Sequence, residues 1–141
     1  MPDPKPTPTE LIFTAWNAHK GEGYIDGDVK IMWKSHKKNR RGEISKEIKD
    51  AINLRLRDYD LEDILEAIDN YAMVLLSKDY TWRYVWALTF FLTRHRPGYR
   101  TELQLLRWLP DYFNADDYLP QQDRQPQQPE SAFDKMVKEE R

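Results

Sequence analysis

Apolar side chains recur every three or four residues along much of the chain, which is the spacing of one face of an α-helix. The clearest stretch covers residues 61–76; it follows Asp60, a good N-cap, and has acidic side chains on its opposite face. The same spacing predicts a helix over residues 46–57, capped by Ser45, and a shorter helix over residues 9–17. Three amphipathic helices are therefore expected.

The segment TWRYVWALTFFLTRHR, residues 81–96, is apolar on nearly every side. This pattern predicts a helix in the middle of a bundle, with Thr81 as its cap and Pro97 directly after its end. A further helix is predicted over residues 101–109, before Pro110.

Together these elements predict an all-α domain over residues 9–119, a compact bundle of about five helices. A small β-hairpin is also permitted over residues 24–33, where an Asp-Gly turn signal lies between apolar residues. The proline-rich residues 1–8 are expected to form a disordered leader, and the Gln- and Pro-rich residues 120–141 a flexible tail. Within that tail, the sequence permits a short helix over residues 131–140.

The composition fits a single water-exposed domain. Of the 141 residues, 40% are hydrophobic and 33% are charged, which allows one core beneath a polar surface. No apolar run approaches the roughly 18 residues of a membrane span, and no signal peptide precedes the domain, so no membrane contact is expected. Cysteine is absent, which excludes disulfides and thiolate zinc sites and fits the cytoplasm. No cofactor or metal is expected.

The net charge of -2 hides two blocks of opposite sign. A polyanion senses a local field, within a Debye length of about 8 Å, more than it senses the net charge. We therefore interpret residues 34–41 as a nucleic-acid-binding segment that contacts phosphates, extended by Lys46 and Lys49 on the next helix. The alternative is a charged loop that is only solvated. The segment contains no acid and five cations: Lys34, Lys37, Lys38, Arg40 and Arg41.

The aromatic segment offers a second nucleic-acid candidate. On a helical projection, Trp86 and Phe90 lie beside Arg83 and Arg94. Aromatic rings next to guanidinium groups can stack bases. The alternative interpretation places both rings in the core, with the two arginines reaching out to water.

The acidic block, residues 58–69, contains six acids and no base. Glu62, Glu66 and Asp69 form a candidate partner-binding face there, and Phe133 and Met136 add an apolar candidate in the tail. The alternative is a face that is only solvated. The aromatic border of the bundle also permits self-association.

Signals for catalysis are few. Asp26, Asp28 and Lys30 follow a pattern by which some nucleases hold Mg²⁺ and position a water molecule. That chemistry needs a mixed sheet around the carboxylates, which the helical pattern does not supply. The three histidines lie far apart and lack metal-ligand spacing. The chain is therefore predicted not to be an enzyme.

Residues 44–94 resemble a known family. The matching features are an Arg55-Leu56 pair that closes one helix, the helix LEDILEAIDNYA after it, and an aromatic pattern before a basic residue. That pattern consists of Trp82, Tyr84, Trp86, Leu88, Phe91 and Leu92. With Trp16-Asn17 upstream, the segment resembles the C-terminal domain of phage replication-initiation proteins, the replisome organisers, which are similar in layout to DnaD-like helicase loaders.

The resemblance implies a small helical module at a phage replication origin, in the cytoplasm of the host cell. Such a module touches DNA, particularly single strands, and recruits or loads a helicase or another replication protein. The resemblance supplies no residue-level motif for DNA contact, so the DNA-binding residues above come from charge alone. The alternative hypothesis is a protein-interaction module without DNA binding, such as a phage-encoded inhibitor or adaptor of a host enzyme.

Overall fold

The computed structural model describes residues 5–95 and 103–120 of the chain. The short helix predicted over residues 131–140 lies outside these ranges, as does half of the predicted leader. The described elements are α1 (Pro8–Asn17), β1 (Gly23–Asp26), β2 (Val29–Met32), α2 (Lys46–Leu56), α3 (Leu61–Leu75), α4 (Leu88–Thr93) and two 3₁₀ helices, η1 (Gln104–Trp108) and η2 (Ala115–Tyr118).

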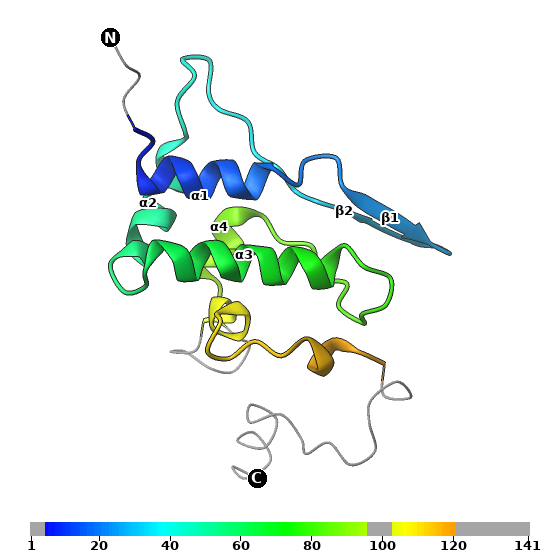
Figure 1. Cartoon of the computed structure of the whole chain (residues 1–141). Coiled ribbons are helices and arrows are strands. Elements are labelled where there is room, and N and C mark those ends of the chain that lie inside the picture. Colours follow the sequence, from blue (N-terminus) through cyan, green and yellow to red (C-terminus); the bar gives the residue numbers. More distant parts are fainter. Residues whose placement is uncertain (1–4, 96–102, 121–141) are drawn as a thin grey trace.

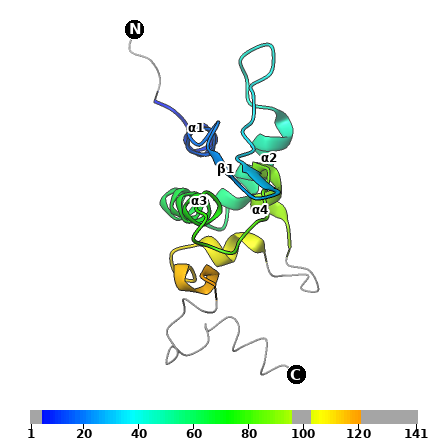
Figure 2. The ribbon, with the colours of Figure 1, turned by 90° about the vertical axis from the view of Figure 1, so that its right-hand side faces the viewer.

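Helix α3 forms the middle of the molecule. Helix α1 packs along one side of it and η1 packs on the other (Figure 1). Helices α2 and α4 pack against each other, and in Figure 2 they lie to one side of the row that α1 and α3 form. The hairpin of β1 and β2 extends past the end of α3, so it stands out from the helical body (Figure 1).

The prediction of an all-α bundle of about five helices is wrong. The described residues form a mixed fold, with four α-helices and a two-stranded antiparallel sheet. The strands pair Tyr24 with Ile31 and Asp26 with Val29, within the range where a hairpin was permitted. Gly27 is the first of the two turn residues and has a φ of 60°, a conformation that glycine adopts without strain.

The helix predicted over residues 81–96 is mostly absent, because residues 81–87 are not helical. Some of their backbone groups are instead bonded to side chains or to distant backbone. The hydroxyl of Tyr71 accepts from the Trp86 backbone N–H (2.7 Å) and donates to the Tyr84 carbonyl (3.0 Å). The Thr81 N–H donates to the Tyr118 carbonyl (2.7 Å). Tertiary bonds therefore overrule the local helical pattern.

The helix predicted over residues 101–109 is also wrong in type and extent. Only Gln104–Trp108 is helical, and it is a 3₁₀ helix. Leu103 forms an isolated antiparallel bridge with His95, and the Gln104 N–H donates to the Arg94 carbonyl (2.9 Å). These long-range bonds tie the start of η1 to the end of α4, and they compete with the bonds of a longer α-helix.

Tyr71 lies fully buried at the centre of an aromatic cluster. Its ring stacks on Trp16, with centroids 5.8 Å apart, and on Trp86, with centroids 5.4 Å apart. Each favourable ring pair contributes about 0.5–1.5 kcal/mol beyond burial, so this cluster binds several elements together. Burial raises the pKa of the Tyr71 hydroxyl, which keeps it protonated and able to donate. Three further rings contact Tyr71 at 5.1 to 5.4 Å, those of Trp33, Phe91 and Trp108.

The Tyr71 hydroxyl provides a test of this account. Tyr71→Phe keeps the ring but leaves the Trp86 N–H without its acceptor, so we expect the free energy of unfolding in urea to fall by about 1–3 kcal/mol. The matched control is Tyr112→Phe, because Tyr112 is 68% exposed, and this change is expected to cost less than about 0.5 kcal/mol. Equal losses in the two variants would contradict the role of the hydroxyl.

Candidate nucleic-acid interface

The basic block lies between β2 and α2, on a segment that we name the basic arm, residues 34–43. The arm rises away from the helical body above α1 (Figure 1), and it also stands clear of the helices in Figure 2. Within the described ranges, none of its cationic side chains forms an ion pair with a carboxylate. Their charge therefore faces solvent. All five cations are exposed: Lys34, Lys37, Lys38, Arg40 and Arg41.

The base of the basic arm is fixed to the end of α1. The side chain of Asn17 donates to the His36 carbonyl (2.9 Å) and accepts from the His36 backbone N–H (2.8 Å). Two indoles add to this attachment: Trp16 donates to the Lys34 carbonyl (2.7 Å), and Trp33 donates to the Trp16 carbonyl (2.8 Å). Because Trp16 is fully buried, the path of the arm is anchored in the core.

The tip of the arm is a turn closed by Asn39. Its side-chain oxygen accepts from the N–H groups of Arg41 (2.9 Å) and Glu43 (3.0 Å). The backbone of Asn39 accepts from the Gly42 N–H (2.9 Å) and donates to the Glu43 carbonyl (2.8 Å). Gly42 has a φ of 77°, which favours glycine at this position. These bonds fix Arg40 and Arg41 at the outer end of the arm.

The His36 imidazole links the arm to α4. Its Nε2 atom accepts from the backbone N–H of Leu88 (3.0 Å), the first residue of that helix. Burial lowers the pKa of His36, and the Glu47 carboxylate opposes this with a smaller effect. An accepting Nε2 carries no proton, so the imidazole is neutral in this arrangement.

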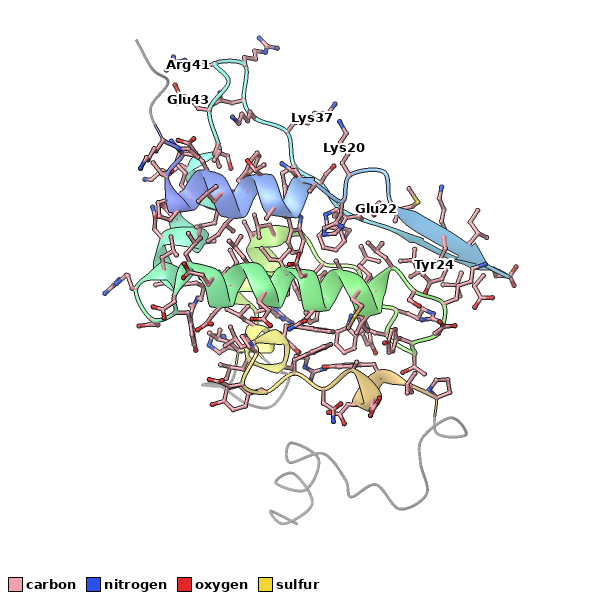
Figure 3. All side chains as sticks on the ribbon, in the orientation of Figure 1. Lys20, Glu22, Tyr24, Lys37, Arg41 and Glu43 are labelled. Carbon is pink, nitrogen blue, oxygen red and sulfur yellow. The ribbon has the colours of Figure 1, made fainter. Side chains whose placement is uncertain are left out.

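Other cations extend the basic surface. Lys46 and Lys49 are exposed on α2, directly after the arm. Lys20, on the loop after α1, projects from the same side of the molecule as Lys37 (Figure 3). Glu43 lies two residues after Arg41, and it pairs with none of the arm cations within the described ranges.

The two arginines predicted beside the aromatic rings have separate surroundings. Arg83 lies against the hairpin: its guanidinium is 3.9 Å from the Asp26 carboxylate and 5.6 Å from the centre of the Tyr24 ring. Arg94 is exposed and lies over the ring of Phe90, at 5.2 Å from its centre. Phe90 is 37% exposed, so this ring and cation form a partly open pair on α4.

The candidate partner face is exposed on α3. Glu62, Glu66 and Asp69 all face solvent. Asp69 also lines a shallow groove of about 320 Å³ between α3 and the loop after α1, together with Met73. Phe133 and Met136, the apolar candidates in the tail, lie outside the described residues.

The carboxylates of the nuclease pattern sit at the tip of the hairpin. Asp26 and Asp28 flank the turn at Gly27, and both are exposed. In the part of the chain that the structure describes, no three His, Cys, Asp or Glu residues are grouped so that they could hold a metal ion. None of the helices there has the length and apolarity needed to span a bilayer.

Sequence reasoning missed the residues that organise the arm. Asn17 and His36 carry no local signal, because their partners lie on distant segments. Asn39 did carry a local signal, because an Asn followed three residues later by a Gly, here Gly42, is typical of a turn. Lys20 lies outside the basic run, and only the fold brings it to the same side.

Comparisons with protein-family models, with curated proteins and with solved structures find no match for this chain. The likeness to phage replication initiators is therefore a matter of sequence pattern alone.

Removing the Asn39 side chain tests whether it fixes the tip. Asn39→Ala deletes the acceptor of two backbone N–H groups, so we expect hydrogen exchange of the Arg41 and Glu43 amides to accelerate about tenfold. The free energy of unfolding should change by less than about 0.5 kcal/mol, because the tip is exposed. In the control, Asn53→Ala on α2 removes the side-chain oxygen that accepts from the Thr9 hydroxyl on α1, and it should leave the arm amides unchanged. Unchanged exchange in Asn39→Ala would contradict the assignment.

Proposed function

We propose that this chain is a non-enzymatic module that binds nucleic acid through the phosphate contacts of its basic arm. The observation that carries the proposal is the set of five exposed arm cations, none of which is neutralised by a described carboxylate. Each phosphate that a Lys or Arg neutralises releases condensed counterions, which drives binding even for a protein of slightly negative net charge.

The attachment of the arm supports the same proposal. Asn17 fixes the base and Asn39 fixes the tip, so the backbone between them is ordered before any ligand arrives. A pre-ordered arm loses less conformational entropy on binding than a free loop does. Lys and Arg contacts to phosphates carry no base information, so little sequence preference is expected.

Single-stranded DNA is the proposed ligand. Phe90 presents a partly exposed ring with the Arg94 guanidinium 5.2 Å from its centre, and such a pair can stack an unpaired base. The bond from Leu88 to His36 joins the base of the arm to the start of α4, two residues before Phe90. In the proposed complex, one single strand contacts both the arm and this ring. A duplex keeps its bases paired and would gain nothing from it.

The proposed biological role is that of a replication accessory module, which recruits a helicase or another replication protein to DNA. Its support is the sequence resemblance, together with the separation of two surfaces of opposite charge. Glu62, Glu66 and Asp69 are exposed on α3, whereas the cations project from the arm. A protein partner on α3 would leave the arm free to hold DNA.

Neutralising the arm tests the DNA-binding proposal. We expect Lys37, Lys38, Arg40 and Arg41, all changed to Ala, to weaken binding of a labelled oligonucleotide by about 10- to 100-fold at low salt, because up to about four phosphate contacts are lost. The slope of log affinity against log salt should become shallower by about 2–3, the value for that many single-strand contacts. Fluorescence anisotropy at two salt concentrations measures both quantities.

The matched control removes the same charge elsewhere. Lys5, Lys30, Arg57 and Lys78 are exposed and lie off the arm, and changing all four to Ala should alter affinity by less than about threefold. If both variants weakened oligonucleotide binding equally, net charge alone would explain the effect, and the arm would have no specific role. Absence of oligonucleotide binding by the unaltered chain would instead favour the protein-interaction alternative.

A further inference from the structure

We propose that His36 is a pH-sensitive latch: as a neutral imidazole it holds the base of the basic arm on α4, and on protonation it leaves α4 and joins the arm cations in binding nucleic acid. The coupling to nucleic acid rests on the function proposed above. The latch itself is a property of the free protein and can be observed without a ligand.

The structural basis is an unusual way of capping α4. The first N–H groups of a helix have no partner within the helix, and a side-chain oxygen at the N-cap usually accepts from one of them. The N-cap of α4 is Ala87, which has no such oxygen. His36, 52 residues away in sequence, takes this role through Nε2 and accepts from Leu88. Leu88 is fully buried, so its N–H depends on this acceptor.

Protonation removes the acceptor. A proton on Nε2 turns that atom into a donor, which then faces the Leu88 N–H. The imidazolium would also meet the partial positive charge at the start of a helix, which disfavours cations. Both effects push the charged ring away from α4. The Asn17 bonds use only the backbone of His36, so they keep the arm in place while the ring moves.

The charges around His36 come from two parts of the chain. Glu47 on α2 favours the protonated form. Lys34 and Lys37 flank His36 on the arm, and both are exposed. Asn17 on α1 and the first turn of α4 bring no charge. Burial is the largest effect, and it lowers the pKa of His36 below its ordinary value of 6.5.

The signs of the two pH effects are opposite. Because the folded pKa is lowered, the unfolded chain binds more protons, so the contribution of His36 to stability is complete above about pH 6.5 and is lost as the pH falls through the folded pKa. Nucleic acid, in contrast, favours the protonated ring, since an imidazolium among the arm cations can pair with a phosphate. Affinity should therefore rise as stability falls.

The test compares oligonucleotide affinity at about pH 7.5 and about pH 5.5, on either side of the histidine range. The unaltered chain should bind about three- to tenfold more tightly at the lower pH, as expected when one proton is taken up on binding. His36→Gln keeps an oxygen that can accept from Leu88 but does not titrate, and it should lose most of this gain. His19→Gln, which changes the histidine bonded to Glu22, should keep the gain. A gain that persists in His36→Gln would overturn the coupling.

A second measurement on the free protein separates the latch from the proposed function. The ring signals of His36 and the amide signal of Leu88, followed by NMR, should change with a single common midpoint at acidic pH. Hydrogen exchange of the Leu88 amide should accelerate below this midpoint, after correction for the intrinsic pH dependence of exchange. A Leu88 amide that ignores the His36 titration would overturn the latch. If the amide follows His36 but no oligonucleotide binds at either pH, the latch stands and the proposed function fails.

Discussion

The hydroxyl of Tyr71 is the interaction on which the rest of the structure depends. By accepting from the Trp86 N–H and donating to the Tyr84 carbonyl, it replaces two bonds that an α-helix would have made within residues 82–88. The chain there can then cross the core without being helical, and Trp86 stacks on the ring of Tyr71. As a result α4 starts at Leu88, where its first N–H meets the imidazole from the arm.

Concentrated charge on a fixed arm accounts for how a slightly anionic protein could bind a polyanion. The net charge of -2 is a sum over the whole chain. A phosphate near the arm would lie within about one Debye length of the arm cations, and salt screens charges that lie farther away. The tight turn at Asn39 places two guanidinium groups at the outer end of the arm.

Neutral polar side chains position the arm cations, and these side chains differ in how they respond to pH. Asn17 and Asn39 keep their bonds at any physiological pH, because amides do not titrate. His36 is the exception: it performs a similar positioning role with an imidazole, a group that can take up a proton. The arm thus combines fixed attachments with one attachment that responds to protons, at the place where the scaffold joins the basic surface.

Local sequence determined α2, α3, the hairpin turn at Gly27 and the basic run, since each depends on spacing, capping or composition within a few neighbouring residues. It misled over residues 81–87, where an apolar run predicted a helix. Only the tertiary structure decided the conformation of that segment, because its backbone groups bond to Tyr71 and Tyr118, which are distant in sequence. The same holds for the arm: the sequence identified its cations, but the attachments through Asn17 and His36 join residues 19 and 52 positions apart. No local pattern records such pairings, because they exist only once the chain has packed.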